Sequence, residues 1–126
     1  MTTLVCFRTT HGHFALPAEA TLAVRRSDGL VDLPAPLPEI VGVLPGDPPI
    51  CVMSALGGGS DHILVVTSDG QQYGLHVLEV LGVQRVAVDD IGPAPKGQLG
   101  GLICGVVNIN HEMVLIADEH ALAARL

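Results

Sequence analysis

Short apolar runs separated by turn residues are the feature that most constrains what this chain can fold into. Runs rich in Val, Ile and Leu recur along almost its whole length, with Gly, Pro, Asp or Asn between them. Such runs favour strands, because β-branched side chains pack well on a pleated surface and glycine or proline interrupts regular pairing. The pattern therefore predicts an all-β sandwich or barrel of short strands.

The expected strands follow from these runs. They are Thr3–Thr9, His13–Leu16, Thr21–Arg26, Ile40–Leu44, Ile50–Ser54, His62–Thr67, Gln72–Val77, Leu78–Val86, Leu102–Ile109 and Met113–Ala117. The segment Leu78–Val86 is too rich in apolar residues for clean alternation. It predicts either a strand buried on both faces or a strand bent by a bulge at Gly82.

Three further segments carry signals of their own. Pro17–Ala20 predicts a single helical turn, because proline is favoured at the first position of a helix. Asp118–Leu126 predicts a C-terminal helix with Asp118 as its N-cap. The glycine run at 57–60 predicts a flexible link, which we expect to mark the boundary between two halves of the chain.

The composition predicts one domain with an aliphatic core. A chain of 126 residues is a common size for one domain and can bury a stable core without metal or disulfides. Hydrophobic residues make up 48% of the sequence, yet Phe7, Phe14 and Tyr73 are its only aromatic residues. The core must therefore be built from Val, Leu, Ile and Ala.

The charge balance excludes two classes of partner. Thirteen acidic residues face six basic ones, which gives a net charge of −7. Nucleic-acid binding needs clustered cations, and single-strand binding adds aromatic stacking platforms, so we exclude nucleic acid. An anionic membrane surface is disfavoured for the same reason, and no apolar run approaches the roughly 20 residues that span a bilayer.

The cysteines and the first residues indicate the compartment. The N-terminal segment lacks the basic stretch and long apolar run of a signal peptide. Cys6, Cys51 and Cys104 are odd in number and lie in β-branched runs, which favours buried free thiols in a reducing environment. We therefore expect a cytoplasmic protein with no direct membrane insertion.

Residues able to carry out chemistry are present but not arranged in a recognisable pattern. No Cys or His pair has zinc-finger spacing, and neither an HExxH motif nor a Gly-x-Ser-x-Gly elbow occurs. The carboxylate pairs Asp89–Asp90 and Asp118–Glu119 are explained by a loop and by a helix start. We predict a protein that is not an enzyme and has no cofactor. A small metal- or ligand-binding barrel using His11, His13 and His62 remains an alternative.

Four stretches of the chain form a pattern of glycine, apolar and proline residues in a fixed order. The most distinctive stretch begins with Gly-Leu-x-Val, continues with Val at every third position and ends with Asp-Ile-x-Pro-x-Pro. Its matching residues are Gly74, Leu75, Val77, Val80, Val83, Val86, Asp90, Ile91, Pro93 and Pro95. The other three are the spacing in Leu4–Leu16, Val41–Val43 followed by Ile50–Leu56, and Cys104–Val106 followed by Val114–Asp118. In these four stretches the chain resembles the CheW-like family, the coupling proteins of bacterial chemotaxis. The resemblance covers nearly the whole chain.

The resemblance implies a single CheW-like domain over residues 1–126, made of two small five-stranded β-barrels with a groove between them. It also implies an adaptor that couples the cytoplasmic tip of a chemoreceptor to the regulatory domain of a CheA-type histidine kinase. Such contacts are mainly apolar, and a docking helix can bury its apolar face in a groove. The alternatives are an adaptor of a type IV pilus or gliding system, and a divergent member that only self-associates.

The resemblance points to eight positions. Thr21, Val24, Val77, Val80 and Val83 line up near the receptor groove or the kinase face, with core packing as the alternative for about half of them. Gly42 and Gly105 open two equivalent hairpins, where close packing is the alternative to direct contact.

The eighth position is a departure from the family. Its first turn usually has Asn-Leu-Arg-Gly, whereas this chain has Pro45-Gly46-Asp47-Pro48. A carboxylate at Asp47 thus replaces a guanidinium. The replacement predicts either drift in a solvent loop or a changed partner, because charge reversal at an interface is costly.

Overall fold

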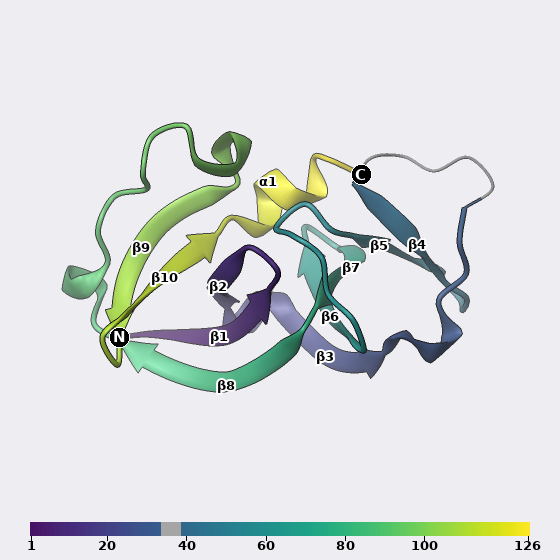
Figure 1. Cartoon of the computed structure of the whole chain (residues 1–126), viewed down its shortest axis with the longest axis horizontal. Helices are drawn as coiled ribbons and strands as arrows, with labels where there is room; N and C mark the ends of the chain where they lie inside the picture. The colour runs from purple at the N-terminus through teal and green to yellow at the C-terminus, as the bar shows by residue number, and fades with distance from the viewer. Residues whose placement is uncertain (34–38) are drawn as a thin grey trace.

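The computed structural model describes residues 1–33 and 39–126 and consists mainly of strands in two five-stranded sheets that lie side by side (Figure 1). The strands are β1 (Thr2–Thr9), β2 (Gly12–Pro17), β3 (Thr21–Arg26), β4 (Ile40–Leu44), β5 (Ile50–Met53), β6 (His62–Ser68), β7 (Gln71–Val77), β8 (Glu79–Val86), β9 (Ile103–Ile109) and β10 (Glu112–Ala117). The 3-10 helices are η1 (Ala18–Ala20), η2 (Ser27–Gly29), η3 (Val88–Asp90) and η4 (Gln98–Gly101), and α1 spans Glu119–Ala123. The predicted all-β class is confirmed.

The chain changes sheet where two strands nearly join. The first sheet has the order β8-β1-β2-β10-β9 and the second the order β3-β6-β7-β5-β4. The chain passes from β2 into β3 through η1, and from β7 into β8 through the single residue Leu78. The boundary expected near residues 57–60 is wrong, since this segment connects β5 to β6 within the second sheet.

Neither sheet closes into a barrel through a continuous ladder. In the first sheet, the chain beyond β8 forms one antiparallel bridge to β9, from Gly92 to Val106. In the second, the chain beyond β3 forms one bridge to β4, from Val31 to Val43. The two five-stranded units are confirmed, but each is an open sheet joined at its edges by a single bridge.

The largest apolar cluster lies between the two sheets. Phe7 and Phe14 of the first sheet stack with ring centroids 6.0 Å apart, and the cluster continues into Tyr73 and Leu75 of the second sheet. Smaller clusters fill the inside of each sheet, one around Ala15 and one around Val52. The two sheets therefore share most of what stabilises them.

The glycine segment is not a flexible link. The Thr10 amide donates to the carbonyl of Gly58 (2.9 Å), and the Gly58 amide donates to the hydroxyl of Thr10 (2.8 Å). Thr9 Oγ1 donates to the Leu56 carbonyl at 2.7 Å. Gly59 lies so close to the second sheet that a Cβ there would overlap the backbone of Val77. These contacts hold the β1–β2 turn against the second sheet, so the segment is packed. The glycine composition alone does not reveal such contacts.

Helix α1 links the two sheets at the end of the chain. As predicted, Asp118 caps it, accepting from the amides of His120 (2.9 Å) and Ala121 (3.3 Å). Although it follows β10, α1 packs on β6 of the second sheet. The Tyr73 hydroxyl donates to the Glu119 carbonyl at 2.8 Å, and Ser68 Oγ lies 2.6 Å from His120 Nδ1. The helix is shorter than expected, ending at Ala123.

Replacing Gly59 by alanine tests whether the glycine segment is a structural fastening. We expect Gly59→Ala to lower the free energy of unfolding by about 3 kcal/mol, because the new methyl overlaps backbone atoms that cannot rotate away. In Gly58→Ala the nearest atom would be Thr10 Oγ1 at 3.7 Å, so this neighbouring control should change stability little. Urea unfolding followed by circular dichroism measures both. Equal stability of the two variants would show that the segment is a loose linker.

Candidate protein-protein interface

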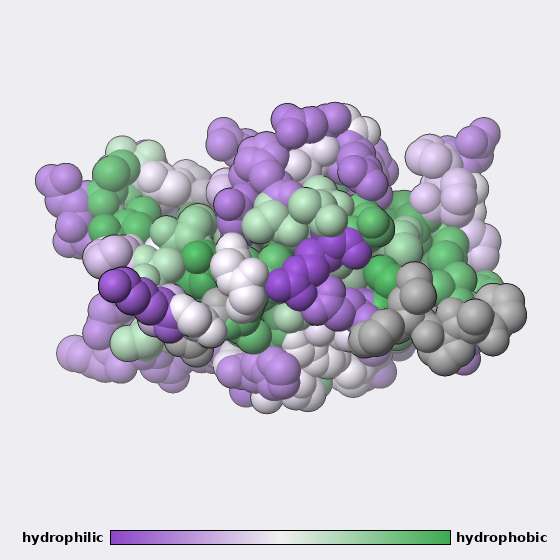
Figure 2. Space-filling model, turned by 90° about the horizontal axis from the view of Figure 1, so that it is seen from above, coloured by the Kyte–Doolittle hydropathy of each residue, from purple (hydrophilic) through white to green (hydrophobic). Residues whose placement is uncertain are grey.

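A shallow apolar groove lies where the edges of the two sheets meet. Its floor is formed by Val5 of β1 and Leu64 of β6, and its walls by the first halves of β3 and β8. Both edge strands run along the lower side of Figure 1, where β3 leads to the right and β8 leads to the left. Figure 2 shows the opposite face, where polar residues lie among apolar ones. We call this surface the β3–β8 groove; it is lined by Val5, Thr21, Leu22, Ala23, Val24, Leu64, Val80, Gly82 and Val83.

Four of the positions predicted from the sequence come together in this groove. Thr21 and Val24 line it from β3, and Val80 and Val83 line it from β8. Val83 is 61% exposed, which is unusual for a valine in a strand. Val77 is fully buried in the cluster shared by the sheets, so of these five positions it is the core residue.

Two exposed leucines were not predicted as site residues: Leu22, which lines the groove, and Leu81, which lines a separate hollow beside Cys6 and His13. Leu22 has no partner in the β3–β6 ladder, because Thr21 pairs with Val66 and Ala23 with Val65. Leu81 is equally unpaired, because Gly82 and Val80 pair with consecutive residues of β1. The two bulged leucines are 50% and 48% exposed. For Leu81 the sequence did carry a signal, namely the bulge predicted at the neighbouring Gly82. The alternative prediction, that β8 is buried on both faces, is wrong.

Gly42 and Gly105 occupy equivalent places in the two sheets. Each directly precedes the residue that forms the bridge closing its sheet. A Cβ on Gly42 would lie 2.5 Å from the Val31 carbonyl oxygen, and one on Gly105 would lie 3.2 Å from that of Gly92. Both glycines are buried. Glycine is needed at both positions because two backbone segments approach each other too closely there for a side chain.

A family model described as the CheW-like domain matches residues 48–126. The chain belongs to the CheW-like family. Its fold matches the crystal structure of the scaffolding protein TtCheW from Thermoanaerobacter tengcongensis with a TM-score of 0.81, over 93% of this chain and 88% of that one at 20% identity. None of the curated proteins compared with the chain matches it significantly.

The turn that departs from the usual CheW-like pattern lies outside the groove. Asp47 stands in the connection between β4 and β5 and is exposed to solvent. The exposed Val31, which bridges to Val43 of β4, belongs to the same part of the second sheet. The structure thus separates the eight predicted positions into groove residues, packed residues and one distal turn.

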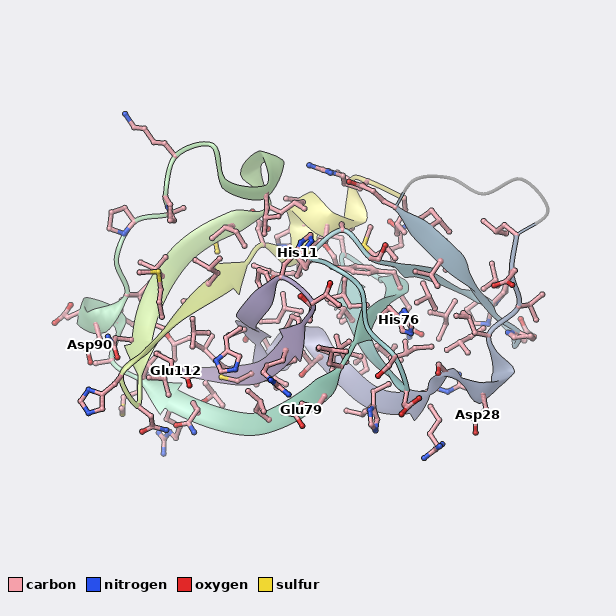
Figure 3. All side chains as sticks on the ribbon, in the orientation of Figure 1. His11, Asp28, His76, Glu79, Asp90 and Glu112 are labelled. Atoms are coloured by element: carbon pink, nitrogen blue, oxygen red, sulfur yellow. The ribbon has the colours of Figure 1, made fainter. Side chains whose placement is uncertain are left out.

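The histidines do not assemble a metal site in this CheW-like chain. Among the residues described, no three His, Cys, Asp or Glu side chains converge so that they could hold a metal ion. His13 Nδ1 is 2.5 Å from Glu112 Oε2, whereas His62 Nδ1 lies 3.4 Å from the Leu78 carbonyl oxygen. Figure 3 shows His11 and Glu112 at separate places on the first sheet. The alternative built on His11, His13 and His62 therefore has no support here.

The thiols are poor nucleophiles. Burial raises the pKa of Cys6 and Cys51. The pKa of Cys104 is raised by desolvation of its partly buried sulfur and by Asp118 and Glu119. A raised pKa keeps the thiol protonated at neutral pH, and the protonated form does not attack. The expectation that all three residues are buried is correct for Cys6, whereas Cys51 is half-buried and Cys104 is exposed, with only its sulfur partly covered.

Across residues 1–33 and 39–126, no helix has the length and apolar character needed to pass through a membrane.

Alanine at the two bridge glycines separates packing from partner contact. We expect Gly42→Ala to reduce the free energy of unfolding by about 2 kcal/mol and Gly105→Ala by about 1 kcal/mol, because the former brings its methyl closer to backbone. Gly29→Ala is the control, since no atom lies within 4 Å of its added methyl. Chemical denaturation measures all three. Unchanged stability in both bridge variants would instead assign the glycines to partner contact.

Proposed function

We propose that this chain is a non-catalytic adaptor of a chemotaxis-like signalling array. In this proposal the β3–β8 groove binds the helical cytoplasmic tip of a chemoreceptor. The distal end of the second sheet, with Asp47 and Val31, binds the regulatory domain of a CheA-type histidine kinase. Membership of the CheW-like family supports the general role. The observation that carries the proposal is the groove, because it is an exposed apolar surface at the junction of the two sheets.

The groove suits a helix better than an added strand. Strand addition needs a regular row of free backbone groups along a sheet edge. In β3 and β8 that row is interrupted by the bulges at Leu22 and Leu81, which also turn apolar side chains outward. A helix instead contributes side chains at intervals of three and four residues, and these can fill a groove between two edges.

The far end of the second sheet is the surface that we propose for the kinase. Val31 is an exposed valine at this end of the sheet. Asp47 is an exposed carboxylate in this turn, at the position where the resemblance to the family predicts an arginine. An adaptor needs two separate binding surfaces, and the groove and this turn lie on different parts of the fold.

A charge placed in the groove should abolish receptor binding. We expect Val83→Arg to weaken binding of a purified chemoreceptor tip fragment at least about tenfold, because an arginine would replace an apolar contact at the centre of the interface. The fold should tolerate the change, since Val83 is already exposed. Isothermal titration calorimetry measures the affinity.

Met113→Arg is the matched control for this experiment. Met113 is a 67% exposed residue of β10 that does not line the groove. Its variant should bind the receptor fragment like the wild type. Equal weakening by both variants, or by neither, would contradict a receptor site in the groove.

Asp47→Arg tests the second surface. Restoring a guanidinium in this turn should change the affinity for the isolated regulatory domain of a CheA-type kinase by about tenfold, because charge reversal at an interface alters electrostatic complementarity. Binding of the receptor fragment should not change. Asp89→Arg, which makes the same charge change at an exposed position in η3, is the control. Biolayer interferometry with both partners measures the effect; an unchanged kinase affinity would place the turn outside the interface.

A further inference from the structure

A second hollow lies on the inner side of the first sheet, between the edge strand β8 and the β9–β10 turn, and its volume is about 240 Å³. It is lined by Cys6, His13, Leu81, Gly82, Gln84, Ile109, Asn110, Glu112 and Val114, and we call it the first-sheet hollow. Of these residues, Gly82 alone also lines the β3–β8 groove. Figure 3 shows Glu112 at the end of the first sheet that lies away from the second. The proposed adaptor function therefore leaves this hollow unused.

Small side chains leave the space open. The two sheets share one pattern of strand pairing, in which a bulged leucine separates two paired residues of the edge strand. Next to the bulge, Cys6 lies opposite Gly82 in the first sheet, whereas Val65 lies opposite Ala23 in the second. Protein interiors are close-packed and contain few voids larger than a water molecule. The smaller pair of residues in the first sheet thus leaves a space that a ligand can fill.

The polar groups of the hollow favour a cation over an anion. His13 Nδ1 lies 2.5 Å from Glu112 Oε2, which leaves the other carboxylate oxygen as an acceptor. When the imidazole is neutral and donates from Nδ1, its Nε2 is an acceptor as well. None of the described residues that line the hollow is a lysine or an arginine, and the chain carries a net charge of −7. An ammonium group therefore finds acceptors here, whereas a carboxylate finds no cationic side chain.

The remaining walls are apolar and limit the size of the ligand. Leu81, Ile109 and Val114 contribute aliphatic side chains, and the buried Cys6 thiol stays uncharged because burial raises its pKa. A cavity of about 150 Å³ is known to hold one benzene molecule. The first-sheet hollow is somewhat larger, so it has room for a ring with a short polar chain.

We propose that the first-sheet hollow binds a small organic amine. Its ammonium group donates to Glu112 and His13, and its apolar body, of about six to eight carbon atoms, packs against Leu81, Ile109 and Val114. His11 and His62 do not line the hollow, so this site differs from the three-histidine site rejected above. The inference adds a ligand to the protein and does not depend on the proposed adaptor function.

Three probes that share a phenyl ring and differ in charge can test this site: phenethylamine, phenethyl alcohol and phenylacetate. We expect the wild type to bind the amine about tenfold more tightly than the alcohol, and the acetate most weakly, because a charge-assisted hydrogen bond is stronger than a neutral one. Glu112→Gln should remove this preference for the amine. Leu81→Ala should weaken the amine and the alcohol equally, by about threefold, because it removes apolar contact common to both. Heteronuclear NMR titration measures each affinity, and the amide signals of Cys6, Ile109 and Val114 should shift on binding.

Asp89→Asn is the control for net charge. It removes one carboxylate at an exposed position that does not line the hollow, so it should keep the wild-type preference. Equal binding of the three probes, binding of none, signal shifts confined to other parts of the chain, or an unchanged preference in Glu112→Gln would overturn the inference. Binding of a receptor tip fragment is measured separately, so the adaptor function stands or falls independently of this result.

Discussion

The apolar cluster between the two sheets is the interaction on which the rest of this structure depends. Each sheet has only a small cluster of its own, and the largest side chains of both sheets, including Phe7, Phe14 and Tyr73, are buried where the sheets meet. Burial of such side chains is the main favourable contribution to folding, at about 1.5–3 kcal/mol for each large apolar residue. The two sheets therefore stabilise each other and form one folded unit.

The same packing creates the β3–β8 groove. When two open sheets share a core, their edge strands are brought next to each other, and here these edges are β3 and β8. Exposed sheet edges invite pairing with other chains, and bulges are one of the means by which proteins prevent it. The bulges at Leu22 and Leu81 do this while exposing apolar side chains. An edge protected in this way still leaves an apolar surface beside it, which is where we propose that a helical partner binds.

The local features of the fold were predictable because they depend on neighbours in the sequence. The Asp118 cap, the turn after Pro17 and almost every strand are set by hydrogen bonds and steric preferences within a few residues. The glycine segment was predicted wrongly for the opposite reason. Position 59 must be glycine because the backbone of Val77, far away in the sequence, leaves no room for a Cβ. The composition of the segment fits a flexible linker equally well. The open edges of the sheets were likewise not visible in the pattern of apolar residues.

The sequence by itself determined the all-β class, the positions of the strands and membership of a family, because alternating apolar residues and turn signals act locally. Only the tertiary structure decided which of the predicted site residues lie together. Val77 and Val83 belong to the same apolar pattern, yet one is buried in the shared core and the other is exposed in the groove. That difference arises because the chain changes sheet at Leu78, and the pairing of distant strands, which local sequence does not encode, sets the side on which each residue lies.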